Sequence, residues 1–178
     1  MIMKKMIKFL PLFIGVIMML SFSSCKKSED GSSIFGSMTA KVNGTAWSSL
    51  TRVTTVQSGN ILLTGQPGLA TADQSIAITI KGVTLKTYTL SAYTLAGECL
   101  VVYYKKAAAV SGSTDYYVSY AASVTLTKYD ATSKLISGTF TATLVPTTAL
   151  STLGALLDPN FADKITITEG KFENVSFL

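Results

Sequence analysis

Carboxylate pairs are the side chains of this sequence that could carry acid–base chemistry. The chain has no histidine, which excludes Ser-His-Asp triads, Cys-His dyads and histidine-bound zinc. Glycoside hydrolysis needs only two carboxylates at a fixed separation, and Glu169 and Glu173 flank one expected turn. Most acidic residues, however, stand in turn contexts, where solvated carboxylates are ordinary. We therefore expect no enzyme activity and no catalytic residues.

Oxygen ligands for calcium are the second possibility. Asp158, Asn160 and Asp163 lie close together in the sequence, and Ca²⁺ prefers carboxylate and amide oxygens. The spacing of an EF-hand is absent, and Pro159 stiffens the segment. The end of a short helix explains these residues more simply, so we expect no metal site and no cofactor.

Tyrosines are the best candidates for ligand binding. Five of them occupy two neighbouring runs: Tyr103, Tyr104, Tyr116, Tyr117 and Tyr120. Adjacent residues of a strand point to opposite faces, so one tyrosine of each pair should be exposed. We take Tyr104 and Tyr117 as candidate ligand-binding residues whose rings could stack on a sugar or a protein partner. Ordinary cross-strand aromatic pairing, which stabilises a sheet by itself, is the alternative.

The N-terminus predicts export from the cytoplasm. A basic start with Lys4, Lys5 and Lys8 precedes an uncharged run over residues 9–22. That run is too short to span a bilayer, which needs about 20 apolar residues, but it fits a secretory signal peptide. We place the cleaved signal at residues 1–24.

Cys25 stands where the apolar run meets a charged, serine-rich one. Phe22-Ser23-Ser24-Cys25 resembles a bacterial lipobox, in which the cysteine is acylated and the chain is cut just before it. Cleavage after Ser21-Phe22-Ser23 by ordinary signal peptidase is the alternative. We expect Cys25 to carry more than one acyl chain, such as palmitate, because a single chain anchors only marginally. Residues 25–37 then form a flexible polar tether that reaches roughly 40 Å when extended.

Composition limits the remaining partners. Without the three signal-peptide lysines, the excess of basic over acidic residues falls from five to two. No basic patch with interleaved aromatics remains, so we expect no nucleic-acid partner. Cys99 lies in the apolar run Cys99-Leu100-Val101-Val102-Tyr103, which predicts a small buried thiol. Residues 38–178 are enough for one domain with a real core, and we expect a monomer.

Period-two alternation dominates residues 38–178. Ile76, Ile78 and Ile80 fall on one face of an expected strand, and threonines alternate with apolar residues in several others. This is the pattern of an antiparallel sheet with one solvated face. We expect an all-β fold, an antiparallel β-sandwich or flattened barrel, with about ten strands near residues 37–43, 46–56, 60–66, 75–81, 85–91, 98–104, 116–120, 122–129, 134–145 and 164–177.

Breaks in the alternation predict turns, a bulge and one helix. Residues 129–134 should close a hairpin, and Glu169-Gly170 is a turn signal. The last strand changes phase, so a bulge near Glu173-Asn174 should return its apolar residues to the core. Leucines at helical spacing within residues 147–157 predict a short helix, which could plug one end of the sheets or act as a lid over a ligand cavity.

A family resemblance rests on four pieces of sequence in order. They are Met38-Thr39-Ala40-Lys41-Val42-Asn43-Gly44-Thr45-Ala46-Trp47, Val124-Thr125-Leu126-Thr127-Lys128-Tyr129-Asp130, Ile136-Ser137-Gly138-Thr139-Phe140 and Ile167-Thr168-Glu169-Gly170-Lys171-Phe172. The chain resembles small Bacteroidota envelope lipoproteins that carry a domain of unknown function. The resemblance implies an all-β domain attached to the outer membrane, and it brings no catalytic residues. Attachment at the periplasmic face and at the cell surface both stay open.

These features favour a lipid-anchored β domain that acts as a non-catalytic binding or structural module. Its partner beside the membrane could be a glycan, another envelope protein or a small apolar ligand. The alternative is a lipocalin-like carrier of a small hydrophobic ligand in a closed barrel, with the 147–157 helix as its lid. A filled interior would favour the first, and a cavity of roughly 300 Å³ or more beneath the helix the second.

Overall fold

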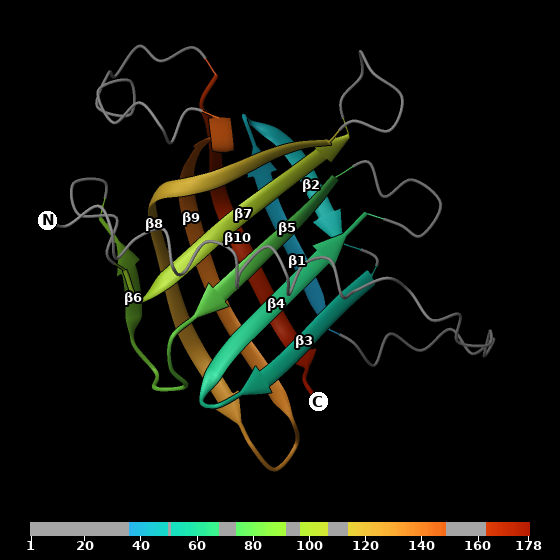
Figure 1. The fold of residues 1–178 in the computed structure, drawn as a ribbon. Coiled ribbons are helices and arrows are strands. Elements are labelled where there is room, and N and C mark those ends of the chain that lie inside the picture. Colours follow the sequence, from blue (N-terminus) through green and yellow to red (C-terminus); the bar gives the residue numbers. More distant parts are fainter. Residues whose placement is uncertain (1–35, 50, 68–73, 92–96, 107–113, 149–162) are drawn as a thin grey trace, which may run out of the picture. The chain divides into compact units, whose positions relative to one another are not determined.

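Antiparallel strands make up nearly all of the chain that the computed structural model describes, which is residues 36–49, 51–67, 74–91, 97–106, 114–148 and 163–178. Ten strands belong to one sheet (Figure 1). Their bounds are β1 (Ser37–Val42), β2 (Thr45–Ser49), β3 (Thr51–Gln57), β4 (Asn60–Gln66), β5 (Gln74–Ile80), β6 (Thr87–Leu90), β7 (Cys99–Lys106), β8 (Thr114–Asp130), β9 (Leu135–Pro146) and β10 (Ile165–Ser176).

The strand order is β2-β1-β10-β9-β8-β7-β5-β4-β3, so most neighbours in space are neighbours in sequence. The long strand β8 pairs with β9 along most of its length, and two strands, β7 and β6, share its other edge. The first part of that edge pairs with β7, and residues 122–125 pair with β6. The backbone N–H of Glu98 also donates to the carbonyl of Thr89, so β6 fills the wedge where β7 and β8 diverge.

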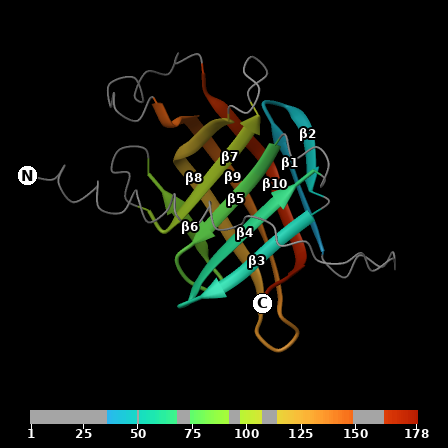
Figure 2. The same cartoon turned by 45° about the vertical axis from the view of Figure 1, so that its right-hand side comes forward.

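The sheet curls so that β3, β4 and β5 cross over β1, β10 and β9 (Figures 1 and 2). Two hydrogen bonds join distant parts of the strand order. The Gln66 N–H in β4 donates to the Ser49 hydroxyl in β2 over 3.1 Å. The Leu178 N–H after β10 donates to the Thr54 carbonyl in β3 over 3.3 Å. The described strands therefore form a curled half-barrel, which confirms the predicted all-β antiparallel class.

The core fills the space inside this curl. Alternate residues of each strand point inward, and Ile76, Ile78 and Ile80 have no exposed surface. The largest fully buried side chains are Tyr88, Phe172, Met38, Ile61, Leu63, Ile76, Ile78, Ile80, Leu126, Ile136, Leu144 and Ile167. Trp47 is buried as well, and so is Cys99, as the sequence predicted. Burial of this apolar surface, at about 25 cal/mol per Å², is the main force that holds the curl together.

Two predictions about local structure are confirmed. The register of β10 against β9 shifts between Phe172 and Val175, which is the bulge expected at Glu173-Asn174, and it leaves Phe172, Val175 and Phe177 buried. The hairpin between β8 and β9 turns at residues 131–134. There the Asp130 carboxylate accepts the backbone N–H groups of Thr132 and Ser133, both over 2.9 Å. A hydrogen bond from the Ser133 side chain, together with these backbone bonds, lowers the pKa of Asp130.

Other boundaries were wrong. The expected strand 46–56 is two strands, β2 and β3. The expected strands 116–120 and 122–129 are one strand, β8, because the break between them is a register shift against β9 rather than a turn. Glu169-Gly170 likewise lies inside β10 as a bulge. This bulge has the residue types of a turn, because Glu169 adopts a positive φ, as the central residues of several turn types do.

Several predictions fall outside the described residues. These are the signal peptide (1–24), Cys25 and the tether before residue 36. The predicted helix over 147–157 is described only at Thr147 and Thr148, which form a 3₁₀ turn.

Candidate functional site

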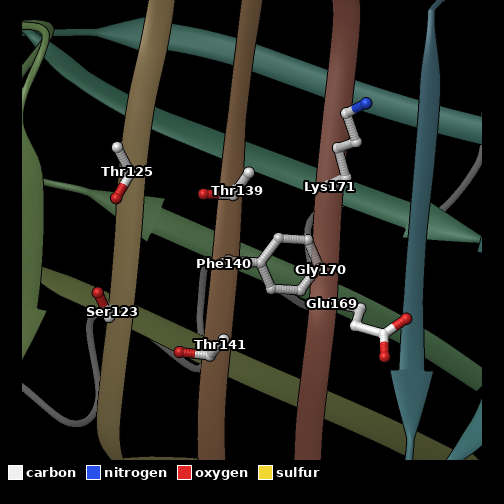
Figure 3. A pocket seen from close by; sticks show the side chains of 8 residues that line it. All are labelled: Ser123, Thr125, Thr139, Phe140, Thr141, Glu169, Gly170 and Lys171. Carbon is white, nitrogen blue, oxygen red and sulfur yellow. The ribbon is translucent and has the colours of Figure 1, made fainter.

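An open, shallow depression lies on the outer face of the sheet, over β8, β9 and β10 (Figure 3). Its volume is about 250 Å³. Four hydroxyl side chains line it together with one carboxylate, one ammonium group, a glycine and an aromatic ring: Ser123, Thr125, Thr139, Phe140, Thr141, Glu169, Gly170 and Lys171. Within the described residues, this depression is the candidate functional site.

The antiparallel register sets the hydroxyl groups in rows. Thr125 in β8 lies opposite Thr139 in β9, which lies opposite Lys171 in β10. Ser123 lies opposite Thr141 in the next row. Directly opposed residues of an antiparallel pair point to the same side of the sheet, and the residues between them point into the core. The alternation that fills the core therefore also builds the hydroxyl surface.

A bulge in β10 shapes one side of the depression. The register of β10 against β9 shifts between Ile167 and Gly170, and Glu169 adopts a φ of 51°. Bulges bend a strand locally and redirect its side chains. Here the bulge places the Glu169 carboxylate at the edge of the depression, beside Gly170 (Figure 3).

Two glycines make room for two phenylalanines across β9 and β10. A Cβ atom on Gly170 would lie 2.7 Å from the Phe140 ring, and one on Gly138 would lie 2.5 Å from the Phe172 ring. Gly170 is paired with Phe140, and Gly138 with Phe172, so each ring covers the glycine opposite it. The two ring centroids are 6.4 Å apart. The depression at Gly170 is therefore lined by backbone, with the Phe140 ring buried beneath it.

The two charged groups of the depression are already paired. The Glu169 carboxylate accepts a hydrogen bond from Lys41 Nζ over 2.7 Å, and Lys171 Nζ lies 2.8 Å from the Glu173 carboxylate. Both pairs are exposed, so each contributes little to stability. The depression thus carries no unbalanced charge. Glu169 and Glu173, the pair considered for glycoside hydrolysis, therefore each face a lysine on an open surface.

The candidate tyrosines lie on opposite sides of the sheet. Tyr103 pairs with Tyr117, with ring centroids 6.2 Å apart, and Tyr103 is buried in the core. Tyr104 pairs with Tyr116 on the outer face, with centroids 5.7 Å apart and the rings edge to face. Burial raises the pKa of both Tyr103 and Tyr117. Tyr104 and Tyr117 are therefore not brought together, and the exposed partner of Tyr104 is Tyr116.

Cys99 is a buried structural thiol. Its Sγ donates to the Tyr88 carbonyl over 3.4 Å, and burial raises its pKa from 9.0 to about 11. A protonated, enclosed thiol is a poor nucleophile. This agrees with the small buried thiol that the sequence predicted.

The residues considered, and set aside, as calcium ligands are only partly described. Asp158 and Asn160 lie outside the described residues, and Asp163 is exposed. No three Cys, Asp or Glu side chains come together elsewhere in the described ranges.

Sequence reasoning identified the lining threonines only as a solvated face. The alternation puts Thr139 and Thr141 on the face of their strand that points away from the core, without assigning them a role. The signal that could have marked them was Glu169-Gly170 within a threonine-rich strand, because a bulge there breaks an otherwise even surface. Which strands lie beside β9 could not be read from the pattern of a single strand.

The fold and its outer surface define an all-β module built from one curled antiparallel sheet. A family described as "Domain of unknown function (DUF6252)" matches residues 36–176. Because this match covers most of the chain and every described strand, the protein belongs to that family. Searches of curated proteins and of solved structures gave no significant match.

None of the described residues forms a helix long and apolar enough to cross a membrane.

Proposed function

We propose that the protein is a lipid-anchored module of the bacterial outer membrane, related to Bacteroidota envelope lipoproteins, and that its β domain binds a partner without catalysis. The observation that carries the binding part is the filled interior. The inward side chains of β4, β5 and β7, such as Leu63, Ile78 and Val101, have no exposed surface. A partner is therefore expected on the outside of the sheet, where the depression lies.

The packed core also argues against the carrier alternative. A lipocalin-like protein needs an internal cavity of roughly 300 Å³ or more to enclose a ligand. In the described strands, that space is occupied by side chains such as Phe140, Phe172 and Tyr88. The depression over β8, β9 and β10 is smaller than this and lies on the outer face of the sheet.

The lipid anchor is supported by the sequence around Cys25 and is tested by two single substitutions. The natural host is grown with labelled palmitate, and Cys25→Ala is compared with Cys99→Ala. We expect Cys25→Ala to lose the label and to leave the membrane fraction, because the acyl chains supply the membrane affinity. Cys99→Ala should keep both. If Cys25→Ala still carries label and still sediments with membranes, the anchor assignment is wrong.

Binding at the outer face rather than inside is tested with a fluorescent apolar probe. N-phenylnaphthylamine brightens when it enters an apolar cavity. We expect the fluorescence of the probe to stay near its level in buffer when the folded protein is added, because the packed core has no room for the probe. Stoichiometric, saturable brightening by the folded protein would instead support the carrier function.

A further inference from the structure

We infer that the depression over β8, β9 and β10 is a binding site for an uncharged, hydroxyl-rich chain, that is, a neutral glycan. This rests on the proposed function, because it names the partner of the same binding module. The argument uses the charge, the surface chemistry and the shape of the site.

The charge of the site favours a neutral ligand. Glu169 is bonded to Lys41 and Lys171 is paired with Glu173, so neither group is left to balance a charge on a ligand. An anionic ligand at Lys171 would also meet the Glu173 carboxylate, and a cationic one at Glu169 would also meet the Lys41 ammonium group, so a charged ligand would face repulsion as well as attraction. A neutral ligand can accept hydrogen bonds from a lysine and donate to a carboxylate without breaking either pair.

The surface chemistry of the site matches a sugar. Threonine presents both a methyl group and a hydroxyl, so the rows formed by Thr125, Thr139 and Thr141 are apolar and hydrogen-bonding at once. The Phe140 ring lies beneath Gly170 in the core, so the apolar contacts that this surface offers come from the threonine methyl groups. A sugar ring has the same two properties, with C–H groups on its faces and hydroxyls at its edge. Each hydroxyl of the site can donate one hydrogen bond and accept two, and the Thr125 hydroxyl already shares one bond with the Thr87 hydroxyl over 2.9 Å.

The shape of the site favours a chain over an isolated small molecule. The depression is open to solvent and spans three strands, which lie about 4.8 Å apart. Enclosed pockets bury most of a small ligand, and this surface cannot. An extended glycan that crosses the strands could gain contacts at several successive rings, which is how an open surface reaches useful affinity.

The experiment measures binding of the full-length protein to soluble uncharged oligosaccharides: glucan, mannan, galactan and chitin fragments of about four to six rings. Sulfated or uronate-containing oligosaccharides of the same length serve as charged comparisons. We expect at least one neutral series to bind, with affinity that increases with chain length. Affinity should change little with salt, because no unpaired charge takes part.

A matched pair of variants locates the site. Thr139→Val with Thr141→Val removes two lining hydroxyls and keeps the β-branched shape. Thr127→Val with Thr168→Val makes the same change at exposed positions outside the depression. We expect about a tenfold loss of affinity in the first variant, since each hydrogen bond contributes a few-fold, and no loss in the second.

Several results would overturn the inference. These are no binding by any neutral series, tighter binding of the charged comparisons, and equal loss in both double variants. Unstructured peptides that bind the depression in place of sugars would overturn it as well. None of these results touches the labelling of Cys25 or the exclusion of the apolar probe, so a failure here is distinct from a failure of the anchored-module proposal.

Discussion

Two parts of the sheet differ in how regularly they are built. The pairs β3–β4, β4–β5 and β5–β7 run without a register shift, and we call these four strands the regular limb. The pairs β1–β10, β10–β9 and β9–β8 each contain at least one shift, and we call these four strands the bulged limb. Both limbs send equally buried side chains into one core, so the difference does not concern the core.

The outward faces of the two limbs differ as well. In the regular limb, outward positions mix half-buried apolar residues (Leu62, Ala77, Leu100 and Val102) with half-buried polar ones (Thr64, Ser75 and Thr79). In the bulged limb, outward positions carry exposed threonines, lysines and glutamates, and the depression lies among them. Strand irregularity and a polar surface therefore occur together. We interpret the regular limb as the scaffold and the bulged limb as the face that meets a partner.

The largest expected loss of stability comes from a C-terminal deletion that removes contacts between the two limbs. Deleting residues 175–178 removes the buried Val175 and Phe177, the stacking of Phe177 on Tyr129, and the link from Leu178 to Thr54. Each lost core side chain should cost about 2–5 kcal/mol, so the truncated protein should not fold cooperatively. Urea unfolding followed by circular dichroism measures this. Deleting the exposed Leu178 alone should cost far less, and an equal loss would show that the core contacts are not the reason.

The glycine–phenylalanine pairs should make the bulged limb intolerant of a single added methyl group. Gly170→Ala brings a Cβ atom to within 2.4 Å of the Phe140 carbonyl and 2.7 Å of the Phe140 ring, so we expect a loss of about 1–3 kcal/mol. Ala77→Val adds carbon to the outer face of the regular limb and should change stability by about 0.5 kcal/mol or less. Thermal unfolding compares them. Combining Gly170→Ala with Phe140→Leu should cost less than the sum of the single changes, and strict additivity would contradict the proposed contact.

Substitutions of the two candidate tyrosines should affect stability to different degrees, because their rings lie on different faces of the sheet. Tyr117→Ala removes a ring that packs against the core, and we expect it to cost about 1–2 kcal/mol. Tyr104→Ala removes an outer ring and should cost less than about 1 kcal/mol. If the outer pair with Tyr116 takes part in glycan binding, Tyr104→Ala will weaken binding to the same neutral oligosaccharides while the fold is retained. Equal destabilisation by both changes would contradict the assignment of the two rings to different faces.

A change of stability that appears only at alkaline pH is expected from the thiol at the start of β7. The pKa of Cys99 in the folded state is about 11, above its usual 9.0, so the folded thiol stays protonated while the unfolded one ionises. The unfolded state then binds fewer protons, and the free energy of unfolding should fall as pH rises from about 9 to about 11. Cys99→Val should flatten this part of the pH profile. An unchanged slope would show that other groups cause it.

The local pattern was sufficient to predict much of the bulged limb. The change of phase after Phe172 predicted the bulge at Glu173-Asn174, because Val175 and Phe177 could not otherwise reach the core. The same reasoning failed at Glu169-Gly170, where a bulge and a turn use the same backbone conformation. It also failed between Tyr120 and Ala122, where a break in the alternation of residues within β8 was interpreted as the end of a strand.

The amino-acid sequence by itself determined the strand class, the inward-facing residues, the burial of Cys99 and the absence of histidine chemistry, because each follows from residue type and a period of two. Only the tertiary structure decided that Tyr104 lies opposite Tyr116, that Gly170 lies against Phe140, and that Lys41 neutralises Glu169. These relations join residues 12 to 128 positions apart. They depend on strand register and on the curl of the sheet, which no short stretch of sequence contains.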